Sequence, residues 1–217
     1  MLSISVDIRE KAIANKPVSM SHQDQPISEH GCYYLTFNVT DWTDIFVKPV
    51  FKQIIAESLN YFVDRKGLLV YGWCLMTNHL HLIARASKDF SLTPLATEYK
   101  EFTSKIILQD IDAEPDVRKN WILKNFSDRS RLLRLTDKFQ VWQSNINPVY
   151  IDPENIDVLN EHLDYIHNQP VRDRIVVNPE DYLYSSARDY AGLKGLVAIS
   201  NVQASDSGYF FRRASSF

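Results

Sequence analysis

The feature that most constrains the fold is a pair of apolar runs separated only by Thr77 and Asn78. The first run, residues 68–76, reads Leu-Leu-Val-Tyr-Gly-Trp-Cys-Leu-Met, and the second, residues 79–84, reads His-Leu-His-Leu-Ile-Ala. Apolar runs of this length are typical of strands, and two strands joined by a short turn form an antiparallel hairpin. We therefore expect a sheet that contains this hairpin, in which backbone positions are well fixed.

The second strand of the hairpin begins with two histidines, His79 and His81. Residues two apart on a strand point to the same face, so both imidazoles should lie together while Leu80 and Leu82 face a core. Two imidazoles on one strand can supply two ligands to a divalent metal. An arbitrary pair of this kind is more often two polar residues on a half-exposed strand, so the pair alone does not decide the question.

The elements around the hairpin alternate between strands and helices. We expect a strand over residues 31–40, a helix from Pro49 to Gly67, a helix over about 92–108, a less regular charged segment over 110–134, an extended segment over 139–151, and a long helix from its cap at Asp152, with Pro153 in its first turn, to about 168–170. This order predicts an α+β fold: a ferredoxin-like sandwich, an antiparallel sheet with helices packed on one face.

The composition is that of an ordinary globular chain. It has 217 residues, 45% of them hydrophobic and 24% charged, with no apolar run near the roughly 20 residues of a membrane span and no signal-type leader. We expect a cytoplasmic protein with two free thiols, Cys32 and Cys74. Its expected organisation is an N-terminal arm (1–28), one folded domain (29–190, with an insert at about 110–138) and a polar C-terminal tail (191–217).

The charge balance gives no strong indication of a nucleic-acid partner. The net charge of −3 and the pI of about 6.1 count mildly against one. Residues 118–138, however, carry seven Lys or Arg against two Asp. Such a stretch can contact phosphates, or it can be a solvated charged face.

The long helix carries polar residues beside its apolar stripe. The stripe consists of Ile156, Leu159, Leu163 and Ile166. Tyr165 and Gln169, four residues apart, flank it and could bring a hydroxyl nucleophile and an oxygen-donor metal ligand to the two imidazoles. Alternatively, Tyr165 is a packing aromatic and Gln169 an exposed amide. We expect His162, one turn before Tyr165, to be a surface residue.

Several segments together resemble the single-tyrosine transposases of the IS200/IS605 type, in particular the REP-associated tyrosine transposase branch. They are Trp-Cys-Leu-Met-Thr-Asn-His-Leu-His-Leu (73–82), Trp-Gln (142–143), Asp-Tyr-Ile-His-Asn-Gln-Pro-Val-Arg (164–172), Asn-Pro-Glu-Asp-Tyr (178–182) and Ser-Ser (185–186). They occur in the family's order. The family commonly has Pro where this chain has Thr77, and Asn where it has Gln169.

The resemblance implies an HUH-type nuclease. His79, His81 and Gln169 would hold one Mg²⁺ or Mn²⁺, and Tyr165 would attack single-stranded or hairpin DNA to form a 5′-phosphotyrosine. Asn78 and Arg172 would contact the DNA. The sequence leaves open whether the protein is a monomer or a homodimer, and this decides whether Tyr165 serves the histidines of its own chain or those of a partner.

Two other readings stay open. One is an inactive nucleic-acid-binding module of the same fold, and the other is a metal-dependent hydrolase that uses no protein nucleophile.

Overall fold

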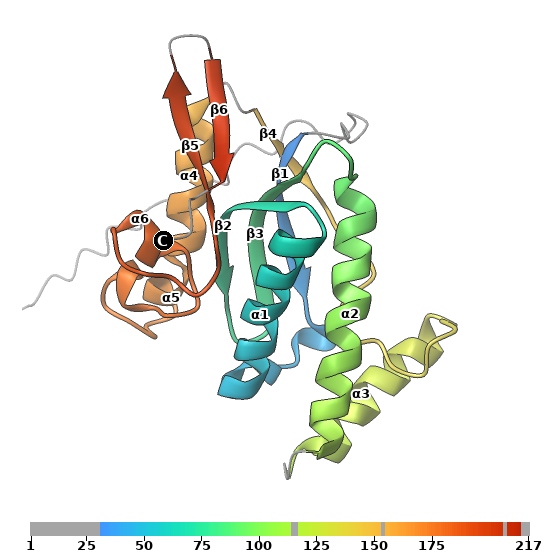
Figure 1. The fold of residues 1–217 in the computed structure, drawn as a ribbon. Helices are drawn as coiled ribbons and strands as arrows, with labels where there is room; N and C mark the ends of the chain where they lie inside the picture. Colours follow the sequence, from blue (N-terminus) through green and yellow to red (C-terminus); the bar gives the residue numbers. More distant parts are fainter. Residues whose placement is uncertain (1–30, 114–116, 153–154, 206–207, 214–217) are drawn as a thin grey trace, which may run out of the picture.

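The computed structural model describes residues 31–113, 117–152, 155–205 and 208–213 (Figure 1). The expected N-terminal arm and Pro153 therefore lie outside the described residues. The strands are β1 (Cys32–Asn38), β2 (Leu68–Leu75), β3 (His79–Ala86), β4 (Val149–Ile151), β5 (Ser200–Ser205) and β6 (Gly208–Arg213). The helices are α1 (Pro49–Arg65), α2 (Leu92–Ala113), α3 (Lys119–Leu132), α4 (Ile156–His167), α5 (Gln169–Arg172) and α6 (Ala187–Tyr190), with short 3-10 turns η1 (Thr40–Trp42), η2 (Ile45–Val47) and η3 (Pro179–Asp181).

The centre of the fold is a four-stranded sheet with the order β2-β3-β1-β4, in which all neighbours are antiparallel. The predicted hairpin is present as β2 and β3, joined by residues 76–78. β1 pairs with β3 over its length, and its last residue, Asn38, lies opposite His79. The predicted α+β class with an antiparallel sheet is confirmed.

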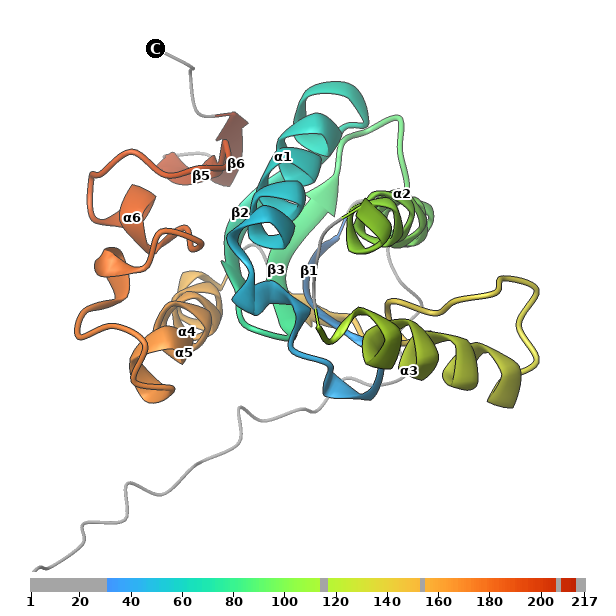
Figure 2. The same cartoon turned by 90° about the horizontal axis from the view of Figure 1, so that it is seen from below.

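Helices α1 and α2 cover one face of this sheet (Figures 1 and 2). The side chains of Leu80 and Leu82 point into the core on that face, together with Phe37 of β1. The hydroxyl of Tyr99 on α2 donates a hydrogen bond of 3.2 Å to the carbonyl of Ile55 on α1, which ties the two helices together. The hydrophobic core on this face is the larger of the two cores.

Helix α4 lies on the opposite face of the sheet, so the expectation of helices on one face alone is wrong. Leu163 and Ile166 of α4 pack against Tyr71 of β2 and Ile83 of β3. The reason is visible in β2, which is apolar at nearly every position and needs cover on both sides. Gly72 permits the close approach, because a Cβ there would lie 2.5 Å from Cδ2 of Leu163.

The ends of two helices differ from the prediction. α4 begins at Ile156, and its N-cap is Asn155, whose side chain accepts a hydrogen bond of 3.3 Å from the amide of Val158. Asp152 is therefore not the cap. α2 continues to Ala113, and part of the less regular segment after it forms α3.

The segment after α5 returns to the free edge of β2. The amide of Leu75 donates to the carbonyl of Tyr184 at 2.9 Å, and the amide of Ser186 donates to the carbonyl of Trp73 at 2.9 Å. Residues 184–186 therefore cover this edge. Beyond them, Val197 is buried in the core and β5 and β6 form a hairpin, so the expectation of a patternless tail is wrong.

None of the helices in the described ranges combines the length and apolar character needed to cross a bilayer. Both cysteines are buried free thiols, as expected.

Candidate active site

The two histidines of β3 lie on the face covered by α4. Because Leu80 between them faces the α1 and α2 core, the alternation of the strand turns His79 and His81 to the other side. Their Nε2 atoms are 3.0 Å apart, with the rings edge to face. His81 is buried and His79 is half-buried. The predicted juxtaposition of two imidazoles is present.

The pair fits a divalent cation. Two ligands bound at about 2.1 Å with a right angle between them lie about 3.0 Å apart, which is the octahedral arrangement that Mg²⁺ prefers. Burial, and secondarily the charge of His79, lowers the pKa of His81 to about 3. Burial also lowers the pKa of His79, although the charge of Asp173 acts in the opposite direction. Both rings are therefore neutral at pH 7, the form that binds metal.

Each imidazole is held through its other nitrogen, Nδ1. His81 Nδ1 lies 2.8 Å from the hydroxyl of Tyr34, which accepts a second hydrogen bond of 3.1 Å from Thr36 Oγ1. His79 Nδ1 lies 2.7 Å from Oδ1 of Asn78. If both Nε2 atoms face a cation, each Nδ1 carries the proton and donates to these oxygens. Partners of this kind fix ring orientation in metal sites.

Tyr165 reaches the histidines from α4. Its half-buried ring stands edge-on to His81, with 5.9 Å between the centroids, and edge-on to Tyr34 at 6.4 Å. Within the described part of the chain, its hydroxyl makes no hydrogen bond, whereas the hydroxyl of Tyr34 is engaged. The guanidinium of Arg172 on α5 lies 5.0 Å from the centre of the Tyr165 ring. The structure thus brings Tyr165 and Arg172 to the imidazole pair.

Gln169, the third predicted metal ligand, makes no hydrogen bond to the histidines in the described part of the chain. It is half-buried at the start of α5, and among the described residues its side chain makes no hydrogen bond. In the same ranges, no three His, Cys, Asp or Glu side chains form a group that could hold a metal. The role of Gln169 as third ligand stays a prediction.

His162 is buried, so the expectation of a surface residue is wrong. Its Nδ1 donates a hydrogen bond of 2.8 Å to the carbonyl of Val158, one turn earlier, and its ring packs 5.4 Å from Tyr34. It lies three residues after Leu159 and one before Leu163, at the spacing of the apolar stripe. This spacing in the sequence is the pattern that indicates burial of His162.

Three further residues of the site escaped the sequence analysis. Tyr34 and Thr36 alternate on β1, which predicts a common face, but only the pairing of β1 with β3 places them beside His81. Asp173, one residue after α5, is exposed, and its charge raises the pKa of His79. No residue spacing links these positions to the histidines.

The part of the chain that carries the histidines is similar to a known protein family. Residues 29–130, which contain both histidines and end before Tyr165, match the family described as "Transposase IS200 like". This confirms the resemblance noted above.

Among solved structures, the chain is similar to one described as "Structure of the REP associates tyrosine transposase bound to a REP hairpin". The TM-score is 0.53 and the identity 18%, and the match covers 91% of this chain and 100% of that chain. At this identity the likeness shows a shared fold. No curated protein matches the sequence.

Proposed function

We propose that this protein is a metal-dependent, single-tyrosine transposase that cuts and rejoins single-stranded DNA through a 5′-phosphotyrosine. The observation that carries the proposal is the pair of Nε2 atoms 3.0 Å apart with the ring of Tyr165 beside it. The imidazoles would fix the position of the scissile phosphate through the metal that they hold, and the tyrosine would supply the nucleophile. A sheet with a purely structural role requires neither feature.

In this reaction the Tyr165 oxygen attacks the scissile phosphorus and loses its proton to solvent. A bond forms between that oxygen and phosphorus, the bond from phosphorus to the 3′ oxygen breaks, and the released 3′ oxygen takes up a proton. Attack by another 3′-hydroxyl reverses the step, so rejoining needs no external energy. A Mg²⁺ or Mn²⁺ ion held by His79, His81 and Gln169 would supply Lewis-acid polarisation of the phosphate.

The DNA would be held by charges around the tyrosine. Arg172, exposed and stacked over the Tyr165 ring, is placed to meet a phosphate that approaches the phenol. Asn78 orients His79 through its side-chain oxygen and is half-buried at the turn between β2 and β3. The solved relative is described as bound to a hairpin, and we propose the same kind of substrate here.

We also propose that Tyr165 acts together with the histidines of its own chain and not with those of a second subunit. Tyr165 and His81 of one chain are already in contact, so no second subunit is needed to complete the constellation.

The test is incubation with labelled hairpin DNA and Mn²⁺, followed by denaturing electrophoresis. We expect a DNA-linked protein band that is abolished in Tyr165→Phe and in His79→Ala. The matched control is Tyr61→Phe, because Tyr61 is an exposed tyrosine on α1, on the far face of the sheet. A covalent band that persists in Tyr165→Phe would refute the assignment of the nucleophile.

Binding without any adduct in the unaltered protein, over a broad pool of hairpins, would favour an inactive nucleic-acid-binding module. Metal-dependent cleavage that survives Tyr165→Phe without an adduct would favour a hydrolase that uses no protein nucleophile.

A further inference from the structure

We propose that Trp42 forms a stacking site for one unpaired DNA base at the edge of the imidazole pair. This inference rests on the proposed function, because it names the place where the strand is held beside the scissile phosphate. Aromatic rings bind unpaired bases by stacking, with little dependence on sequence.

The first observation is the exposure of this indole next to the site. Trp42 is 56% exposed, whereas Trp73 and Trp142 are buried. The centroid of its ring lies 6.0 Å from that of His79, with the planes at 79°. A large apolar side chain thus remains in solvent beside a candidate metal ligand, where a core residue would be covered.

The second observation is the backbone that presents the indole. Asp41 and Trp42 both have positive φ, 50° and 55°, although neither is glycine. Positive φ is uncommon for residues other than glycine and is an outlier for a bulky residue such as Trp42, and such positions cluster at ligand-binding sites, where the surroundings hold them. Relaxation of this turn would move the indole, so the strained backbone fixes where the ring stands.

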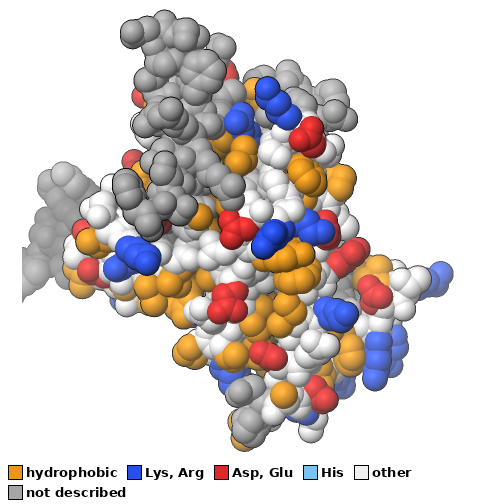
Figure 3. Space-filling model, in the orientation of Figure 1, with side chains coloured by type: hydrophobic (Ala, Val, Ile, Leu, Met, Phe, Trp, Pro, Cys, Tyr) orange, Lys and Arg blue, Asp and Glu red, His pale blue; other side chains and the backbone are white. Residues whose placement is uncertain are grey.

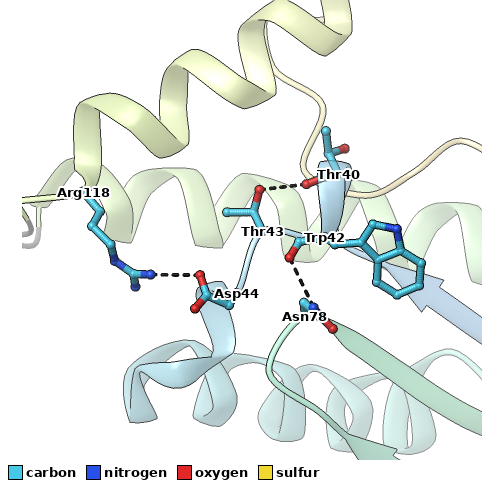
Figure 4. Close-up of polar contacts among 6 residues, drawn as sticks. All are labelled: Thr40, Trp42, Thr43, Asp44, Asn78 and Arg118. Carbon is cyan, nitrogen blue, oxygen red and sulfur yellow. Dashed lines mark hydrogen bonds and ion pairs between the residues drawn. The ribbon is translucent and has the colours of Figure 1, made fainter.

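Hydrogen bonds connect the strained turn directly to the site (Figure 4). The carbonyl of Trp42 accepts a hydrogen bond of 3.2 Å from Nδ2 of Asn78, and the amide of Trp42 donates to the carbonyl of Val39 at 3.1 Å. The same Asn78 holds His79 through its oxygen at 2.7 Å. One amide side chain therefore sets the indole and the imidazole relative to each other.

The flanks of the turn are held by α3 and by a buried threonine. Arg118 pairs with Asp44 at 2.9 Å, and Arg129 lies 3.9 Å from Asp41. The buried Thr43 donates from its hydroxyl to the carbonyl of Thr40 at 2.8 Å (Figure 4). The indole itself points away from these contacts (Figure 4). These contacts hold the backbone of the turn, and the indole of Trp42 stays accessible to a ligand.

A nucleobase is the ligand that fits these surroundings. A phosphate bound at the imidazole pair links two nucleotides, and each of them carries a base. One of these bases would therefore lie within reach of the Trp42 ring, whose centroid is 6.0 Å from that of His79. Basic side chains also gather at the end of the molecule formed by α3, which packs against η1 (Figure 3). They can neutralise the phosphates of a strand that passes the indole.

The experiment measures the affinity of the full chain for a fluorescein-labelled oligothymidylate by anisotropy. EDTA is present, so that a metal held by His79 plays no part. We expect Trp42→Leu to bind about 10-fold more weakly or worse. Trp42→Phe, which keeps an aromatic face, should bind close to the unaltered protein.

The matched control is Trp121→Leu, because Trp121 is similarly exposed, at 51%, on α3. Its affinity should be unchanged. Equal binding by Trp42→Leu and the unaltered protein would overturn the inference and leave the proposed function intact. An equal loss of affinity in Trp42→Leu and Trp42→Phe would also overturn the inference. So would an equal loss of affinity in Trp42→Leu and Trp121→Leu. Failure of the unaltered protein to bind single strands at all would count against the proposed function itself.

Discussion

The Tyr34 hydroxyl should set the metal affinity of the imidazole pair, and Tyr34→Phe isolates its contribution. The substitution keeps the ring that stacks on His81, at 5.7 Å and 20°, and removes the oxygen 2.8 Å from Nδ1. Thr36 Oγ1 lies 3.4 Å from that nitrogen and is a poor substitute. His81 would then lose its best partner for the proton that it must carry on Nδ1 when Nε2 binds metal.

The expected effect follows from the behaviour of such partners in other metal sites. Loss of a group that orients a ligating histidine weakens metal binding about 10- to 100-fold, which corresponds to about 1.4 to 2.7 kcal/mol. Tyr34 acts as a neutral hydroxyl, because burial raises its pKa to about 12. The loss should therefore be the same at pH 6.5 and pH 8.

Isothermal titration calorimetry with Mn²⁺ measures this loss without DNA. Tyr190→Phe is the control, since the Tyr190 hydroxyl also makes a hydrogen bond of 2.8 Å, to the carbonyl of Tyr71, away from the histidines. Tyr34→Phe with an affinity within twofold of the unaltered protein would refute the argument. Both variants should fold, which circular dichroism can verify.

Three further predictions concern stability and DNA binding. Burial lowers the pKa of His167 from 6.5 to about 4, so the unfolded chain binds more protons between these values. The free energy of unfolding should fall by up to about 3 kcal/mol as the pH drops from 6.5 to 4, and His167→Gln should flatten this dependence in urea titrations. An unchanged slope in the variant would contradict the assignment. Gly72→Ala should cost about 1 to 3 kcal/mol in the same assay, because the new Cβ would meet Leu163, and an unaltered midpoint would show that α4 can shift. Arg172→Gln should weaken binding of single-stranded DNA and reduce its salt dependence, whereas an identical salt slope would exclude a phosphate contact.

Local patterns predicted the elements of the site well. The alternation of apolar residues around His79 and His81 was enough to predict their common face, because period two is a property of any strand. The stripe of α4 likewise predicted that Tyr165 would stand at the margin of a packed surface. Both arguments needed only neighbouring residues.

What the sequence did not reveal depends on pairings between distant segments. Tyr34 lies beside His81 only because β1 pairs with β3 in a register that sets Thr36 opposite His81, although Tyr34 and His81 are 47 residues apart in the chain. The sequence pattern places Gln169 one turn beyond Tyr165 on a single helix, but α4 ends at His167 and Gln169 begins the short helix α5, where Pro170 lacks an amide proton. The relation between the two side chains is therefore not that of a continuous helix.

The pairing of residues 184–186 with β2 has a consequence for the movement of DNA. The helix that carries Tyr165 is preceded by β4 at one edge of the sheet and followed by these residues at the other edge. Tethered at both borders and packed on the sheet through Leu163 and Ile166, the helix would have to give up that packing to swing out. A DNA end attached to Tyr165 would stay where it was cut, so strand exchange would require the incoming 3′ end to travel to a stationary covalent intermediate.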